Sequence, residues 1–255
     1  MSALFMRDVW PAWTAQEPPP MTTERLARLA DHKTQLGIFA GNGNRLGTAW
    51  REMTTTGATS TLYGTVLTEP HGIIPATRTE TTTDFNAEGG LEAFTLAVYG
   101  IPETLIQATG ERHGIFFPCE FQFGVLRRRV NLDLSATRMI GDSLQPFGYL
   151  PELRVGQAWR MQILDPLSAL AGGKVRFQSV VARVTGSEVI DHQGRPVECF
   201  VVVTDPHPIK AWVDDQGQVC VQEAEMPGFG KVVLRAEPYD ALARQQARQR
   251  ISQNN

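Results

Sequence analysis

The sequence predicts a mainly β fold, a curved antiparallel sheet or incomplete barrel with short flanking helices. Short apolar runs alternate with polar residues, and the 23 glycines and 16 prolines punctuate them, as is typical of many strands and turns. The clearest case is a hairpin in which Ile209, Ala211 and Val213 alternate with polar or aromatic residues before a DDQG turn, and Val219 and Val221 alternate after it. A chain of 255 residues with 42% hydrophobic content is long enough to bury a sizeable core.

The flanks differ from this pattern. Residues 1–21 form an N-terminal arm with two tryptophans and an arginine among apolar residues, so we interpret it either as juxtamembrane, behind a membrane anchor, or as an arm that packs on the domain. Residues 22–35 are predicted as a short helix because a threonine precedes the run ERLARLADHK. Residues 237–255 are predicted as a C-terminal helix and tail that start at Glu237-Pro238.

Between the flanks, residues 36–236 are predicted to form one antiparallel half-barrel domain of ten or eleven strands. An Asn-Gly turn over residues 41–44 joins the first two strands. In the run VLRRRVNLDLSA, Arg127–Arg129 are interpreted as a solvated strand face, as charges that guard a sheet edge or, less often, as an anion site. The run MIGDSLQPFGYLPELRVGQ has no clear period and is predicted to cross the sheet as an apolar loop.

Composition excludes several classes of protein. A net charge of -3 and a pI near 6.0 give no basic face for nucleic acid. No run of about 20 apolar residues could span a membrane as a helix. Cys119, Cys199 and Cys220 lack the spacing of a metal site. If Val201 pairs with Trp212 and Trp212 with Val219, then Cys199 and Cys220 point to opposite faces and no disulfide joins them.

Catalytic motifs are not found. The five histidines never take the HxH, HxxxH or HExxH spacings, no GxSxG elbow occurs, and the glycine-rich run at 41–47 leads into a strand instead of a helix. His113 and Cys119 invite a thiol-dependent hydrolase or transferase, but six positions on an extended strand span roughly 20 Å. The sequence therefore favours a protein that is not an enzyme, with no cofactor and no metal.

Two stretches carry a resemblance to a known family. The run LRVGQAWRMQILDPLSA, which begins at Leu153, and the run KAWVDDQGQVCVQEAEMPGFGKVVLR, which ends at Arg235, resemble uncharacterised bacterial envelope proteins, some of them found upstream of transglutaminase-like domains. Those proteins are similar in fold to the lipoprotein carriers LolA and LolB. The resemblance implies a half-barrel with an apolar concave face, and a location in the bacterial periplasm or cell envelope, with the N-terminal anchor absent from this chain.

In the lipoprotein carriers the concave face holds acyl chains, so the resemblance implies a candidate ligand site here. Its inward residues would be Trp159, Met161, Ile163, Phe177 and Phe200, with Phe147 and Tyr149 from the crossing loop as a lid. The same residues are ordinary core if they leave no cavity. The leading hypothesis is an envelope protein that binds a lipid or lipoprotein ligand. The alternative is an assembly module of a membrane-associated complex, which predicts partners there and an exposed apolar patch or an unpaired sheet edge.

Overall fold

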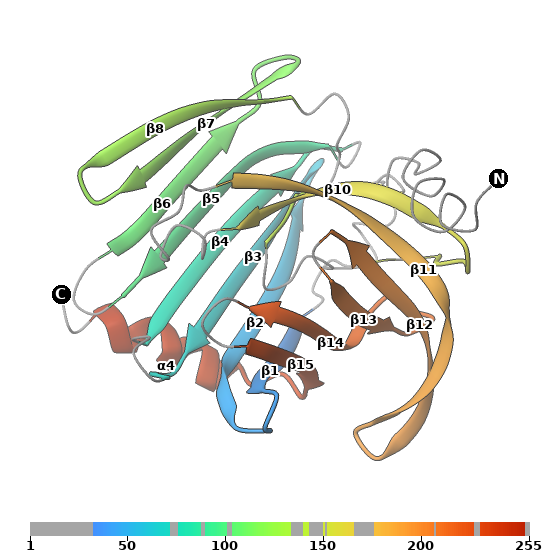
Figure 1. The fold of residues 1–255 in the computed structure, drawn as a ribbon. Coiled ribbons are helices and arrows are strands. Elements are labelled where there is room, and N and C mark those ends of the chain that lie inside the picture. Colours follow the sequence, from blue (N-terminus) through green and yellow to red (C-terminus); the bar gives the residue numbers. More distant parts are fainter. Residues whose placement is uncertain are drawn as a thin grey trace. The chain divides into compact units, whose positions relative to one another are not determined.

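The computed structural model describes residues 33–71, 76–87, 90–100, 104–133, 140–142, 150, 152–165, 176–206, 208–226 and 230–252. These residues contain fifteen strands and one helix (Figure 1). In chain order they are β1 (Lys33–Ala40), β2 (Arg45–Thr56), β3 (Thr59–Thr68), β4 (Thr77–Phe85), β5 (Leu91–Tyr99), β6 (Thr104–Glu111), β7 (Phe116–Phe123), β8 (Leu126–Asp133), β9 (Ile140–Asp142), β10 (Ala158–Asp165), β11 (Arg176–His192), β12 (Arg195–Asp205), β13 (Ile209–Val213), β14 (Val219–Met226), β15 (Gly230–Glu237) and α4 (Ala241–Ser252).

The described elements fall into two compact units. The N-terminal unit consists of β1–β8 together with the residues from Ala236 onward, which include α4, and the C-terminal unit consists of β9–β14 and of β15 as far as Arg235. In the N-terminal unit the strand order is β8-β7-β6-β5-β4-β3-β2-β1, and in the C-terminal unit it is β15-β14-β13-β12-β11-β10-β9. Neither order closes, because β1 does not pair with β8 and β9 does not pair with β15. The prediction of a mainly β, antiparallel and unclosed architecture is confirmed.

Short turns make the antiparallel order possible. Between β1 and β2, the amide of Gly43 donates to the Ala40 carbonyl oxygen at 2.8 Å, and Gly43 has a φ of 88°, which a glycine adopts without steric cost. Such turns leave no room for a crossover, so each strand pairs with its neighbour in sequence. β9 also pairs with its neighbour in sequence, β10, but this pairing is parallel.

The C-terminal unit is curved. β11 bends along its seventeen residues (Figure 1), and its register against β12 shifts between Val184 and Gly186. An extra residue in one strand of an antiparallel pair increases the local twist and bends the strand. A second register shift, between Trp212 and Val213, affects the hairpin of β13 and β14. This shift decides which side chains of β14 face the core.

The core of the N-terminal unit is aromatic where β5, β6 and β7 meet. The rings of Phe94 and Phe117 stack with centroids 5.9 Å apart. Gly110 on β6 leaves room for them, because a Cβ there would lie 2.6 Å from the Phe94 ring and 2.9 Å from Cys119 Sγ. Burial of such rings is a large source of stability.

Two predictions at element boundaries are wrong. Residues 33–35, at the end of the predicted helix 22–35, are strand, because Lys33 pairs with Glu52 and Gln35 with Trp50. The rest of that helix and the arm 1–21 lie outside the described residues. The C-terminal helix begins at Ala241, not at Glu237-Pro238, because β15 runs to Glu237 and Asp240 Oδ1 caps the helix by accepting from the Ala243 amide at 2.9 Å.

The predicted ten or eleven strands are also too few for the fifteen described strands. The stretch from Thr104 to Phe123 is two strands, joined by a tight turn in which the His113 amide donates to the Phe116 carbonyl oxygen at 2.9 Å. Gly114 in that turn has a φ of 65°. In the predicted crossing loop, Ile140–Asp142 are the strand β9 instead, and residues 143–149 lie outside the described residues.

Candidate functional site

The predicted ligand-binding residues that the structure describes belong to a packed core. Trp159 and Met161 on β10 are 1% and 0% exposed, and they pair with Ala182 and Val180 on β11, which are also buried. Phe200 on β12 is half-buried and packs against the same core cluster. Ile163 and Phe177 lie on β10 and β11, but their side chains lie outside the description, as do Phe147 and Tyr149 altogether. Ligand binding by these seven residues stays a prediction.

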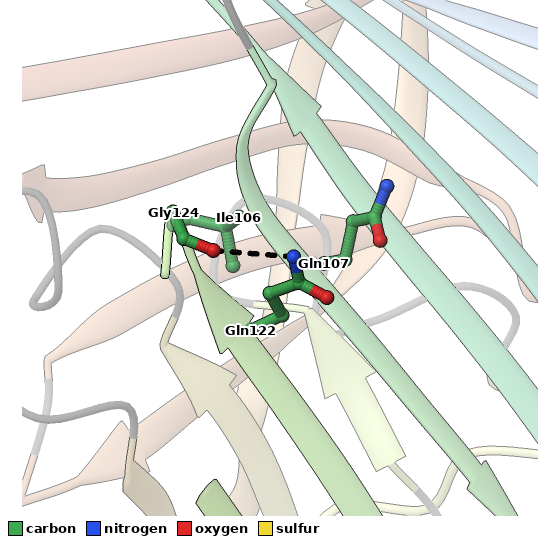
Figure 2. A pocket seen from close by; sticks show the side chains of 4 residues that line it. All are labelled: Ile106, Gln107, Gln122 and Gly124. Carbon is green, nitrogen blue, oxygen red and sulfur yellow. Dashed lines mark hydrogen bonds between the residues drawn. The ribbon is translucent and has the colours of Figure 1, made fainter. Parts of the chain in front are cut away.

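A small hollow opens on the N-terminal unit. Figure 2 shows it between β6 and β7, lined by Ile106, Gln107, Gln122 and Gly124. Its volume is about 50 Å³, and the Gln122 side-chain amide donates to the Gly124 carbonyl oxygen at 3.1 Å across one side. Sites for small molecules usually measure about 300–1,000 Å³. This hollow is therefore too small for an acyl chain.

The thiols lie in apolar surroundings. Cys119 is 1% exposed, and burial raises its pKa to about 12. Burial also raises the pKa of Cys220 to about 12. Thiolates are the reactive form, so neither residue is activated as a nucleophile. His113, six residues before Cys119, forms an isolated bridge with Phe116, the first residue of β7.

Cys199 and Cys220 are closer together than the sequence predicts. Val201 pairs with Trp212 as expected, but Trp212 pairs with Val221 and not with Val219, because the register shifts at Val213. The two buried thiols consequently lie near each other, and each affects the pKa of the other, which contradicts the prediction of opposite faces. Both remain free thiols, as predicted.

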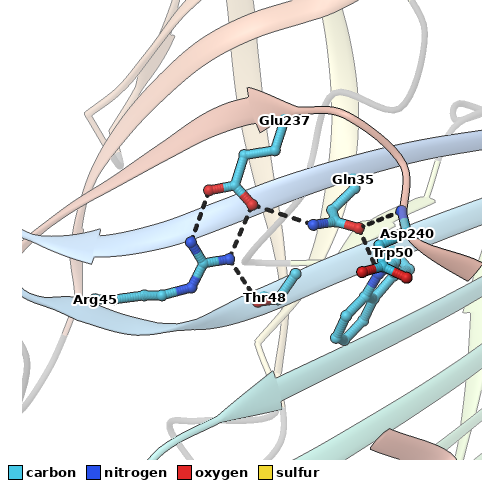
Figure 3. Close-up of polar contacts among 6 residues, drawn as sticks. All are labelled: Gln35, Arg45, Thr48, Trp50, Glu237 and Asp240. Atoms are coloured by element: carbon cyan, nitrogen blue, oxygen red, sulfur yellow. Dashed lines mark hydrogen bonds and ion pairs between the residues drawn. The ribbon is translucent and has the colours of Figure 1, made fainter. Parts of the chain in front are cut away.

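A polar network attaches Glu237, the last residue of β15, and the segment after it to β1 and β2 (Figure 3). Arg45 donates to both carboxylate oxygens of Glu237, at 2.7 and 2.8 Å, and to Thr48. The buried Gln35 donates to Glu237 at 3.2 Å, and its carbonyl oxygen accepts from Trp50 Nε1 at 2.8 Å and from the Asp240 amide at 2.9 Å. The hydrogen bonds from Arg45 hold the pKa of Glu237 below its usual range.

A second polar network, formed by Tyr239 and Arg244, attaches the following residues to β2. Tyr239 donates a hydrogen bond to Glu52 on β2, and the buried Arg244 of α4 forms an ion pair with the same carboxylate. Burial alone would raise the pKa of Glu52, but these two partners outweigh it, and the pKa lies below its usual range. The charged side chains of both networks pair with each other, Arg45 with Glu237 and Arg244 with Glu52, so we interpret the networks as anchors of α4 and not as a binding site.

The hairpin of β7 and β8 lies at one end of the strand order described for the N-terminal unit. β8 ends the strand order of the N-terminal unit, so among the described strands only β7 pairs with it. The pairing is regular over all eight residues, with no bulge, and β8 contains no proline. At the tip, Val125 is 97% exposed and Leu126 is 72% exposed. At the opposite end of β7, Ile115 and Phe116 are exposed as well.

Three arginines follow the apolar tip along β8. Arg127 and Arg129 lie on the same face of the sheet as Glu120 and share its carboxylate, with Arg129 Nε 2.9 Å and Arg127 Nη1 4.0 Å from its oxygens. Their side chains remain 69% and 86% exposed. Arg128 is exposed and pairs in register with Phe121, so it lies on the other face. Residues 120–131 carry three arginines against the single Glu120, a net charge of +2.

Sequence patterns predict only part of this surface of β8 and its tip. The arginine run and the strand over VLRRRVNLDLSA are predicted, and the strand is confirmed over Leu126–Asp133. The exposure of Val125 and Leu126 is missed, because two apolar residues beside a strand normally suggest core. The available signal was Gly124 before them, which marks a turn where side chains leave the sheet.

Other kinds of site are not seen in the part of the chain that the structure describes. No group of three or more His, Cys, Asp or Glu side chains there could hold a metal ion. The helix that it contains is too short and too polar to cross a membrane.

Comparisons with known proteins give no family. No protein-family model matches the sequence, and no curated protein matches it. A DUF1089 family protein from Pseudomonas aeruginosa is similar in structure at 13% identity and a TM-score of 0.40, over 71% of this chain and 90% of that one. The hypothetical lipoprotein YmcC from Escherichia coli K12 is similar at 13% identity and a TM-score of 0.32, over 86% and 90%. Both similarities are too weak to identify the function of this chain.

Proposed function

We propose that this chain is a non-enzymatic interaction module of a membrane-associated assembly in the bacterial envelope, and that it docks a partner along β8. The observation that carries the proposal is the edge of β8, an eight-residue regular strand with an exposed apolar tip, which no other described strand than β7 pairs with. Monomeric proteins usually protect such an edge with charges, a bulge, a proline or a covering segment, since it presents unpaired backbone groups. β8 carries the charges of Arg127–Arg129 but has neither a bulge nor a proline. The envelope location rests on the apolar and aromatic arm 1–21.

The competing functions receive less support. An enzyme centred on Cys119 would need an accessible thiolate, and the thiol is buried with a pKa of about 12. An apolar ligand would need a cavity, and Trp159 and Met161 are packed in a core cluster. Mass spectrometry of gently purified protein tests the ligand hypothesis directly. A stoichiometric copurified lipid would restore it as the leading function.

Site-specific crosslinking in cells tests the proposal. A photoreactive amino acid at Val125 is expected to give a discrete crosslinked product, and the same probe at Val189 is the matched control, because Val189 is also an exposed valine of a hairpin, at 68% exposure. The Val125 product should be lost when Arg127, Arg128 and Arg129 are all changed to glutamate. Equal crosslinking from Val125 and Val189, or none from Val125, would contradict docking at β8.

A further inference from the structure

We infer that the partner docked at β8 is an extended acidic segment of another protein that adds a strand to this edge. The inference rests on the proposed function and names the chemistry of its partner. An extended peptide gains affinity from main-chain hydrogen bonds to a sheet edge, and specificity from the side chains that stand opposite each other. In β8 the backbone is regular, so the charges of its side chains decide what can pair there.

The alternation of the β8 side chains between the two faces of the sheet favours a peptide partner over a flat charged surface. Arg127 and Arg129 lie on one face of the sheet and Arg128 lies on the other. A planar anionic membrane that lies against one face would leave the arginine of the opposite face without a partner. An added strand alternates its own side chains in the same way, so it can offer an acidic residue to each of the three arginines.

The same arginines disfavour a second copy of this chain. If two β8 strands paired antiparallel about Arg128, that residue would face its own copy, and Arg127 would face Arg129. Like charges directly opposite each other are destabilising in a sheet. The three arginines thus destabilise the pairing of two β8 strands and stabilise the pairing of β8 with an acidic strand. A combination of repulsion and attraction of this kind makes an exposed edge specific for one partner.

The side chains of β8 also predict the pattern of the partner. Leu126 and Val130 lie on the same face as Arg128, and Val130 is half-buried. Opposite residues 126–130, the best match is an apolar residue, three acidic residues and a second apolar residue. Because this pattern is symmetrical, it fits β8 in either strand direction. A peptide with the core Val-Glu-Glu-Glu-Val, flanked by threonines, is therefore a suitable probe.

The probe is labelled with a fluorophore, and its binding to the full chain is followed by anisotropy at low salt. We expect the glutamate peptide to bind and the Val-Lys-Lys-Lys-Val analogue to bind roughly tenfold more weakly or worse, since three cross-strand charge pairs are lost. Methylation of alternate backbone nitrogens of the glutamate peptide should also weaken binding about tenfold, because it removes the hydrogen bonds of one strand edge. Hydrogen exchange of the wild-type chain should slow over residues 126–131 when the peptide is added.

Charge reversal supplies the matched variants. The variant R127E/R128E/R129E should prefer the lysine peptide, whereas R195E, which changes an exposed arginine in the turn region of β11 and β12, should keep the wild-type preference. The inference is overturned if the methylated peptide binds as well as the parent, or if vesicles of phosphatidylglycerol bind the chain and the peptide does not. Concentration-dependent dimerisation lost in the triple variant would assign the edge to a second copy instead.

The two levels of the proposal can fail separately. Crosslinking at Val125 in cells without peptide binding would keep the interaction module and overturn the acidic strand. Failure of both experiments would overturn both.

Discussion

Gln35 connects β1, β2 and the segment that leads into α4, so its replacement by methionine tests how that segment is held. Its carbonyl oxygen accepts from Trp50 Nε1 at 2.8 Å and from the Asp240 amide at 2.9 Å, and its side-chain nitrogen donates to Glu237 at 3.2 Å. Methionine has a similar volume and shape, which keeps any cavity small. The substitution therefore removes hydrogen bonds and leaves the packing nearly intact.

The main cost comes from Trp50. Its side chain is 3% exposed, so the indole N–H would lose its acceptor without reaching water, which costs about 1–3 kcal/mol. Asp240 is exposed, and its amide can turn to solvent, so that hydrogen bond and the one to Glu237 add only about 0.5–1.5 kcal/mol together. We expect Gln35→Met to lower the free energy of unfolding by about 2–4 kcal/mol.

Urea unfolding followed by far-UV circular dichroism measures this loss in a double-mutant cycle with Trp50→Phe. Phenylalanine has no N–H to leave unsatisfied, so Gln35→Met should cost at least about 1 kcal/mol less in that background. Hydrogen exchange should also rise over residues 241–252 in Gln35→Met, because α4 loses an anchor. Additivity of the two substitutions within about 0.3 kcal/mol would refute the role of the indole hydrogen bond.

Three further predictions follow from burial and charge. The folded-state pKa values of Glu52 and Glu237 lie below the usual range, so these carboxylates stabilise the fold above the unfolded pKa, near pH 4.3, and the stabilisation is lost as the pH falls through the folded pKa. In urea unfolding at a series of pH values, the free energy of unfolding of Glu237→Gln should fall less toward acid pH than that of the wild type. An unchanged dependence of this free energy on pH would contradict the role of Glu237. Trp159→Ala should lower the free energy of unfolding by about 3–5 kcal/mol and Val155→Ala, at a 60% exposed position, by at most about 0.5 kcal/mol; similar losses in urea melts would argue against a packed core around Trp159. Cys119 should react with a disulfide reagent at pH 8 only at the rate of unfolding, and a rapid reaction in the folded protein, followed by absorbance, would show that its thiol is accessible.

Local patterns in the sequence determined much of the fold. Alternation with a period of two predicts the β13–β14 hairpin, and the Asn-Gly turn predicts the pairing of β1 with β2, because both depend on residues a few positions apart. The same locality explains the errors. The helix predicted over 22–35 includes residues that β1 takes instead, since pairing with β2 outweighs the favourable helical propensity of Lys33 and Gln35.

Contacts between distant residues were decided only by the tertiary structure. Gln35 and Glu237 are 202 positions apart, and no local pattern relates them. The register shift at Val213, which brings Cys199 and Cys220 near each other, depends on how β13 and β14 align along their length. The edge position of β8 also depends on residues that are distant in sequence. The residues of a strand give its face and its charge, but whether another strand covers its outer side depends on the order of the whole sheet, and that order places Arg127–Arg129 where a partner could pair with them.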